Sequence, residues 1–207
     1  MKDNVDSWSR TGTRVFWGEI SPCDHVVQIY EDDQAFLDLL GGFVTGGIYS
    51  DDCVIVIATK EHLTALEDRM KSNDLNVFEL KLRDQYIPLN AEQTLSEFMI
   101  DGWPDEALFS HLITALITRA RIKKRQVRVY GELVALLWAQ GHSGATVPLE
   151  HLWNKLFETE AFSLFSVYPK SGFTQDAHES ILHICGSHSD MIKAVAESKI
   201  EITYKDF

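Results

Sequence analysis

Residues 25–36 read HVVQIYEDDQAF and contain the start of the fold. A short β-branched run, VVQI, predicts a strand, and the acids that follow it predict a turn. After the turn, apolar residues recur at helical spacing as far as Gly46 and Gly47, where we expect the helix to end. A strand, a turn and a helix in this order form the basic unit of an α/β protein.

The turn lies where many α/β proteins hold a nucleotide phosphate. A phosphate loop needs glycines that let backbone N–H groups approach the anion and a lysine that neutralises it, and YEDDQAF has neither. Its three carboxylates, Glu31, Asp32 and Asp33, would repel a triphosphate. We therefore expect Asp32 or Asp33 to cap the helix and Glu31 to face the crevice at the strand end.

The same alternation continues along the chain. Strands that alternate with helices predict a three-layer αβα fold with a mainly parallel central sheet and right-handed crossovers. Beyond the first unit, the periodicity predicts strands at 53–59, 77–82, 127–132 and 162–169, and helices at 60–72, 90–100, 104–124, 133–144 and 147–158. Pro104 suits the first turn of the long third helix of this series. We divide the chain into an arm (1–22), one domain (23–193) and a tail (194–207).

Charge and cysteine content restrict the class of protein. A net charge of -12 disfavours nucleic acid and anionic membranes as partners. The one basic stretch, RARIKKRQVR at 119–128, is either a solvated helix end or a docking surface for an acidic partner. Three cysteines without a CxxC pair indicate no disulfide framework, and no signal peptide or membrane span is evident. We expect a soluble cytoplasmic protein.

In such sheets ligands bind beyond the carboxyl ends of the strands. This rule selects Tyr30–Asp33, Thr59–Glu61, Gly131–Glu132 and Tyr168–Lys170. Glu132 directly follows a predicted buried strand, so it either accepts hydrogen bonds from the start of the next helix or faces a ligand or cation. The same two alternatives apply to Glu150, which either caps backbone amides or reaches inward beside Trp153.

A metal site and a nucleophile are two weaker readings of the histidines and cysteines. The segment HICGSHS offers His183, Cys185 and His188, with a helical spacing between the last two that would suit a metal, but no fourth ligand is apparent. A helix end with Cys185 in the core and a local hydrogen bond from His188 explains the segment better than a metal does. No nucleophile elbow accompanies any serine or cysteine.

Seven segments in order resemble the MEDS family of sensory domains: HVVQIYEDD, GGIYSDDCVIVIAT, FMIDGWPDEALF, VRVYGELVALLW, PLEHLWNKL, SVYP and HICGSHS. The resemblance spans roughly residues 23–193. It implies a fold similar to the recombinase-like (RecA-like) ATPase of the circadian clock, KaiC, with the phosphate loop lost. It also implies ligand sensing in signal transduction, with small organic compounds, hydrocarbon derivatives among them, as the expected signals.

When the family's motifs are matched to this sequence, the resemblance implies a ligand site formed by polar residues and neighbouring aromatic residues. Ser166 departs from the pattern, because the family has a cysteine before its Tyr-Pro pair. The site residues are His25, Tyr30, Glu31, Glu132, Glu150, Trp153, Tyr168 and His188.

We therefore expect a non-catalytic sensor that uses no cofactor and signals to a histidine kinase or transcription regulator, because this chain shows no DNA-binding helix pair or kinase core. Three alternatives stay open. The chain is a degenerate nucleotide-binding domain or ATPase, a metal-dependent enzyme that uses Glu132, Glu150 and His188, or a structural oligomerisation domain. A homo-oligomer is compatible with each of these readings.

Overall fold

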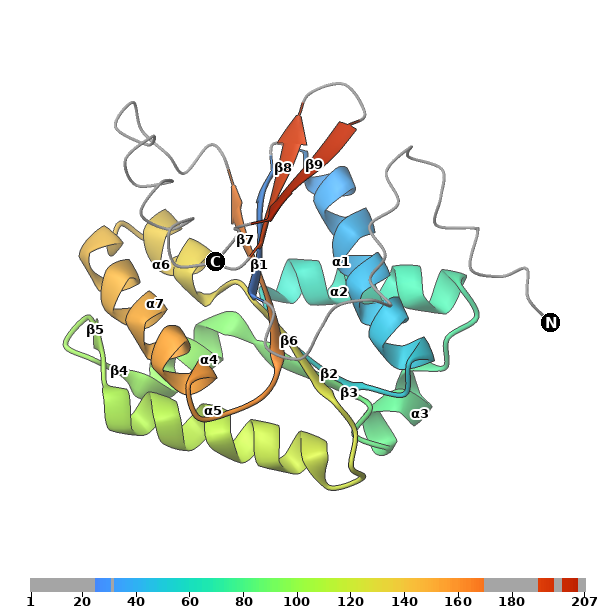
Figure 1. The fold of residues 1–207 in the computed structure, drawn as a ribbon, viewed down its shortest axis with the longest axis horizontal. Helices are drawn as coiled ribbons and strands as arrows, with labels where there is room; N and C mark the ends of the chain where they lie inside the picture. Colours follow the sequence, from blue (N-terminus) through green and yellow to red (C-terminus); the bar gives the residue numbers. More distant parts are fainter. Residues whose placement is uncertain (1–24, 31, 170–189, 196–198, 205–207) are drawn as a thin grey trace.

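The computed structural model describes residues 25–30, 32–169, 190–195 and 199–204. Its centre is a mixed sheet in which six strands run parallel and the last runs antiparallel to its neighbour (Figure 1). The order across the sheet is β3-β2-β6-β7-β1-β8-β9. The strands are β1 (His25–Tyr30), β2 (Cys53–Ala58), β3 (Tyr86–Asn90), β6 (Val127–Gly131), β7 (Ser163–Pro169), β8 (Asp190–Val195) and β9 (Lys199–Tyr204).

Helices cover both faces of this sheet (Figure 1). One face packs against α1 (Asp33–Tyr49), α2 (Lys60–Ser72) and α3 (Val77–Leu82), and the other against α4 (Ala91–Phe98), α5 (Glu106–Arg121), α6 (Leu133–Ala139) and α7 (Ser143–Phe157). Every residue of β2 is buried, as expected for a parallel strand covered on both sides. The predicted three-layer αβα fold is therefore confirmed.

Helix α1 begins as predicted but ends later. The side chain of Asp32 accepts a hydrogen bond from the backbone N–H of Ala35 at 2.8 Å, so Asp32 is the N-cap. The expected stop at Gly46 and Gly47 is wrong, because the helix continues to Tyr49. A Cβ on Gly47 would lie 2.7 Å from Cγ2 of Val54, so this glycine lets α1 approach β2 closely rather than ending the helix.

The strand predicted at 77–82 is wrong. These residues form α3, whose first turn is capped by the side chain of Asn76, and the neighbouring strand is β3. The alternating pattern of VFELKL suggested a strand, but a run of only six residues fits a short helix as well. In this helix the side chains of Phe78 and Leu82 are exposed to solvent. Strand β3 was not predicted because it contains Pro88, and proline argues against a strand. β3 is an edge strand of the sheet, where proline is tolerated.

A small hairpin of β4 (Met99–Ile100) and β5 (Trp103–Pro104) separates α4 from α5 and was not predicted. Pro104 belongs to β5, and Asp105 caps α5 through the N–H of Leu108, so the placement of Pro104 inside the helix is wrong. Helix α7 starts at Ser143, four residues before the expected start, and includes Pro148.

Two further strands, β8 and β9, extend the sheet beyond β1. They were not predicted, and the expected boundary at residue 193 falls inside β8. Among the described residues, no helix is both long and apolar enough to span a membrane.

The basic stretch 119–128 is tied to acids of its own chain. This intramolecular pairing favours a structural role over a docking surface for an acidic partner. The ion pairs are Arg119–Asp84, Arg121–Glu160, Arg125–Asp51 and the buried pair Arg128–Asp52, and Lys123 donates to the carbonyl of Arg83.

Candidate functional site

Glu132 organises the carboxyl ends of β2 and β6. Its backbone N–H donates to the carbonyl of Ile57 at 3.0 Å, which holds it beside the end of β2. Its carboxylate accepts the N–H of Thr59 at 2.9 Å, the O–H of Tyr130 at 2.6 Å and Nδ1–H of His62 at 2.6 Å. Glu132 makes no side-chain cap to α6, so the capping alternative is wrong. The acid instead links two strand ends to the start of α2.

His62 is the most accessible member of this network. Its side chain is 23% exposed, whereas that of Glu132 is 5% exposed. Burial opposes protonation of His62, but the hydrogen bond and charge of Glu132, with help from Asp33 and Glu61, outweigh this and raise its pKa. Nδ1 is engaged with Glu132, and no described residue supplies a hydrogen-bond partner for Nε2. With Nδ1–H given to Glu132, Nε2 of His62 accepts a hydrogen bond when the ring is neutral and donates one when the ring is protonated.

Aromatic rings line the inner side of the network. Phe36 stacks on Tyr30 with ring centroids 4.7 Å apart and meets the His62 ring edge-on at 5.0 Å. Burial, followed by the charge of Glu132, raises the pKa of Tyr30 to about 12 and that of Tyr130 well above its ordinary value. Both phenols are therefore neutral donors at physiological pH.

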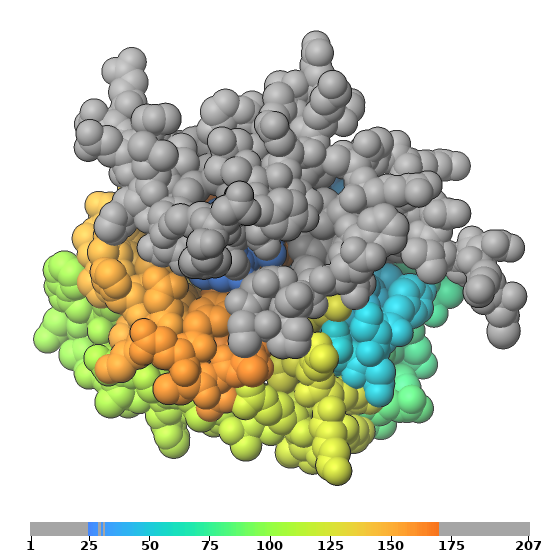
Figure 2. Space-filling model, in the orientation of Figure 1, coloured from blue at the N-terminus to red at the C-terminus, as the bar shows by residue number. Residues whose placement is uncertain are grey.

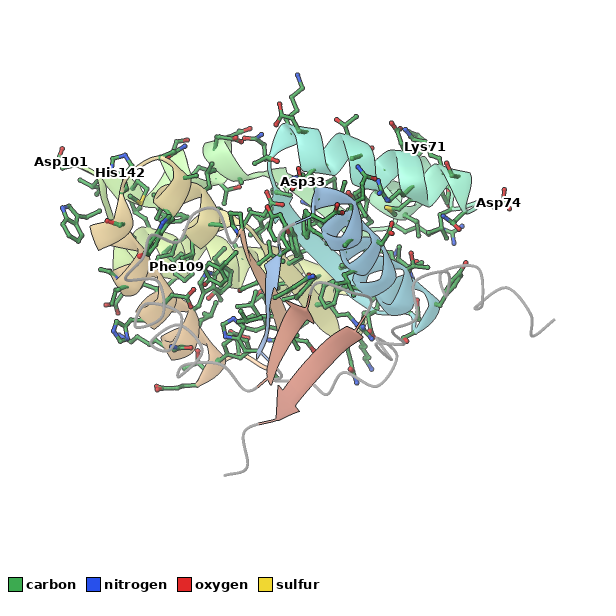
Figure 3. All side chains as sticks on the ribbon, turned by 90° about the horizontal axis from the view of Figure 1, so that it is seen from above. Asp33, Lys71, Asp74, Asp101, Phe109 and His142 are labelled. Atoms are coloured by element: carbon green, nitrogen blue, oxygen red, sulfur yellow. The ribbon has the colours of Figure 1, made fainter. Side chains whose placement is uncertain are left out.

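The start of α1 adds negative charge to this edge. Asp32 caps the helix and Asp33 lies in its first turn, at the end of α1 beside the start of α2 (Figure 3). Glu61 occupies the first turn of α2. These acids lie at the position of a phosphate loop, and Lys60 is the only lysine or arginine within the first turns of α1 and α2. A bound polyphosphate would meet repulsion there.

A second polar group lies on the opposite face of the sheet. Glu150 of α7 is buried and accepts a hydrogen bond from the O–H of Tyr168. Burial raises the pKa of Glu150 to about 7, although the hydrogen bond from Tyr168 lowers it in part. Trp153, one turn further along α7, packs edge-on against Phe109 with centroids 5.1 Å apart. Glu150 thus reaches inward beside Trp153 rather than capping a helix.

His25 lies apart from both groups at the amino end of β1. Its Nε2 is 3.1 Å from Oγ of Ser166, and its ring stacks on Phe157 at 5.3 Å. Tyr30 lies five residues further along the strand, which corresponds to roughly 16 Å. His25 therefore does not join the crevice at the carboxyl edge.

The structure thus divides the eight expected site residues. Tyr30 and Glu132 lie together, and Glu150, Trp153 and Tyr168 form a group on the other face. Glu31 and His188, with the alternative metal ligands His183 and Cys185, lie outside the described residues. Within the described ranges, no three histidine, cysteine or acidic side chains are grouped as a metal would require.

Sequence reasoning missed His62. The edge rule selected Thr59–Glu61 and stopped one residue short of it. The position of His62 in the sequence could have indicated it. A residue three positions after the N-cap Thr59 lies in the first turn of α2, close to the end of the strand.

The fold is that of the RecA/KaiC-like α/β proteins. The chain belongs to the MEDS family, the methanogen/methylotroph, DcmR sensory domain, whose model matches residues 24–189. The confirmed resemblance covers nearly the whole domain that we expected from the sequence.

Solved structures support the fold at low sequence identity. The uncharacterized protein PH0321 of Pyrococcus horikoshii has a TM-score of 0.66 and 8% identity, with 89% of this chain and 84% of that chain covered. The flagellar accessory protein FlaH of Methanocaldococcus jannaschii gives 0.57 and 12%, covering 97% and 81%. The KaiC-like protein PH0186 of Pyrococcus horikoshii OT3 gives 0.55 and 9%, covering 87% and 77%. No curated protein matches the chain in sequence.

Proposed function

We propose that this chain is a non-catalytic sensory domain that binds a small ligand at the carboxyl edge of β1, β2 and β6. The observation that carries the proposal is the Glu132–His62 pair, 2.6 Å apart, backed by the rings of Tyr30, Phe36 and Tyr130. Membership of a sensory family supports a role in signal detection.

The chemistry of the edge favours a neutral, partly apolar ligand with a polar group that can hydrogen-bond to an imidazole nitrogen. Glu132 already accepts three hydrogen bonds, one of them from Nδ1–H of His62, so Nε2 of His62 is the group that would meet the ligand. The aromatic rings would contact its apolar part. Asp33 and Glu61 disfavour phosphates and other anions.

Helix α2 is the element through which binding would be transmitted. His62 lies in its first turn, and its later turns hold α1 through Arg69–Asp38 and α3 through Glu67–Lys81. A ligand that draws His62 toward itself would shift α2 against both neighbours. We propose that a partner protein, a histidine kinase or a transcription regulator, reads this shift.

Thermal denaturation against a panel of neutral organic compounds, nucleotides and metals tests the ligand site, because a ligand of the folded state raises its apparent stability. We expect a neutral compound to stabilise the chain and His62→Gln to reduce its affinity by about tenfold, equivalent to about 1.4 kcal/mol. His111→Gln, on the exposed side of α5, is the matched control and should retain the affinity.

Two outcomes would contradict the proposal. Stabilisation only by ATP with magnesium would favour a degenerate nucleotide-binding domain. A neutral ligand whose affinity is unchanged in both His62→Gln and Glu132→Gln would place the ligand elsewhere in the chain. Native mass spectrometry of the purified protein identifies any compound that is carried through purification.

A further inference from the structure

The β4–β5 hairpin has a tight two-residue turn and a hydrogen bond that closes its base. Its turn residues, Asp101 and Gly102, both have positive φ values, 50° and 83°, as tight hairpin turns require. The N–H of Asp105 donates to the carbonyl of Phe98 at 2.8 Å and closes the base of the hairpin. The hairpin lies at one end of the molecule with the α6–α7 turn, as Asp101 and His142 show in Figure 3.

This rigid hairpin presents apolar surface to solvent. Ile100 is 51% exposed and Trp103 is 56% exposed. A Cβ on Gly144 would lie 3.4 Å from Cη2 of Trp103, so the indole reaches the first turn of α7. Val147, 42% exposed, follows Gly144 by almost one helical turn. We call Ile100, Trp103 and Val147 the hairpin patch, and Figure 2 shows the green hairpin beside the orange surface of α7.

The segments that carry the hairpin patch are rich in acids and poor in lysine and arginine. Residues 85–118 contain no lysine or arginine, and neither do residues 133–154. Lys155 is the next basic residue, and it is paired with Glu106. The acids of the first segment are Glu92, Glu97, Asp101, Asp105 and Glu106.

We propose that the hairpin patch docks a basic, amphipathic segment of a protein partner. Trp103 would serve as the apolar anchor, because exposed tryptophans contribute strongly to interfaces, and the acids would select lysine or arginine on the partner. A second copy of this chain is disfavoured because two acidic rims would meet. The inference goes beyond the proposed ligand site and does not depend on it.

A fluorescein-labelled helical peptide of leucine and lysine tests this surface by fluorescence anisotropy with the full chain. We expect the peptide to bind, and Trp103→Ala to weaken binding by about tenfold. Higher salt should also weaken binding because charge contributes to it. The matched control is Phe78→Ala, which removes an exposed ring from α3 beside Lys81 and should leave binding unchanged.

Glu97→Lys is a second variant, on the exposed side of α4, and it should weaken binding without altering the apolar anchor. Hydrogen exchange should show protection at residues 99–108 and 143–148 when the peptide is bound. The inference is overturned if a leucine–glutamate peptide binds equally well, if Trp103→Ala binds normally, or if Phe78→Ala loses as much affinity. Self-association of the free chain that Trp103→Ala abolishes would also overturn it.

Discussion

Two buried glutamates have different polar partners. The carboxyl group of Glu132 accepts hydrogen bonds from a backbone amide, a phenol and an imidazole. Glu150 is buried in α7, and its carboxyl accepts a hydrogen bond from the O–H of Tyr168 in β7. The first is suited to holding His62 in place, and the second to carrying a proton near neutral pH.

Glu150 should make the fold less stable as pH rises. Its pKa increases from 4.5 to about 7 on folding, mainly through burial, so its stabilising contribution is complete below pH 4.5 and is lost as pH rises through 7. This shift corresponds to on the order of 3 kcal/mol. Urea unfolding at pH 5.5 and pH 8 should show the fall in free energy of unfolding, and Glu150→Gln should remove most of it.

His62, whose pKa is also raised, contributes a smaller dependence of the same sign, which should persist in Glu150→Gln. Glu92→Gln, on the exposed side of α4, is the control and should keep the full dependence. An unchanged pH profile in Glu150→Gln would show that Glu150 does not change its protonation on folding.

Gly47 is the residue that fixes the distance between α1 and β2. In Gly47→Ala the new methyl group would meet Val54 at 2.7 Å and Arg128 at 3.0 Å, so we expect a loss of about 1–3 kcal/mol in free energy of unfolding. Gly144→Ala is the control, because its methyl group would meet only Trp103, at 3.4 Å, and the substitution favours a helix. Equal stability of the two variants would argue against close packing at Gly47.

At the scale of elements, five helices begin with a side-chain cap on their own backbone. This regularity explains why the sequence indicates helix starts better than helix ends. The caps are Asp32 to Ala35, Thr59 to His62, Asn76 to Glu79, Asn90 to Gln93 and Asp105 to Leu108.

Asp32 should stabilise α1 through its cap. We expect Asp32→Ala to lower the free energy of unfolding by about 1 kcal/mol, because the N–H of Ala35 loses its partner. Asp32→Asn should restore most of this stability, since asparagine caps about as well as aspartate. Chemical denaturation of the three proteins gives the comparison, and an equal loss in both variants would assign the effect to charge rather than to the cap.

The sequence predicted long elements well and short ones poorly. Strand β2 and helix α2 were recognised because burial on both faces and a helical stripe each repeat over several residues. Helix α3 and strand β3 were not, because six residues satisfy either period and Pro88 breaks the strand pattern. At the candidate site, Glu132 could be found in the sequence because it directly follows a predicted strand. The pairing of His62 with Glu132 could not be found, because it depends on the parallel register of β2 and β6.

At the scale of the whole molecule, β1 lies inside the sheet between β7 and β8. In the described part of the chain its outer edge is covered by β8, which pairs with it from Val26 to Ile29. The most N-terminal strand described therefore depends on two distant parts of the chain for its backbone hydrogen bonds. The rest of the sheet, from β3 to β7, is contributed by residues 53–169.

Removal of residues 190–207 should therefore expose the edge of β1. An unpaired internal strand with a buried, apolar sequence is a template for aggregation, so we expect a lower melting temperature and increased light scattering. Removal of residues 205–207 alone leaves β8 and β9 complete and serves as the control. A truncated protein that stays monomeric and melts at the temperature of the full chain would contradict this expectation.

The position of β1 also has a consequence for synthesis on the ribosome. Residues 25–30 leave the exit tunnel first among the described strands, but their first neighbour, β7, follows more than a hundred residues later. During that interval the nascent β1 has no partner within the sheet, while β2, β3 and β6 can already associate. We infer that the candidate ligand edge, to which β1 contributes Tyr30, is completed late in translation.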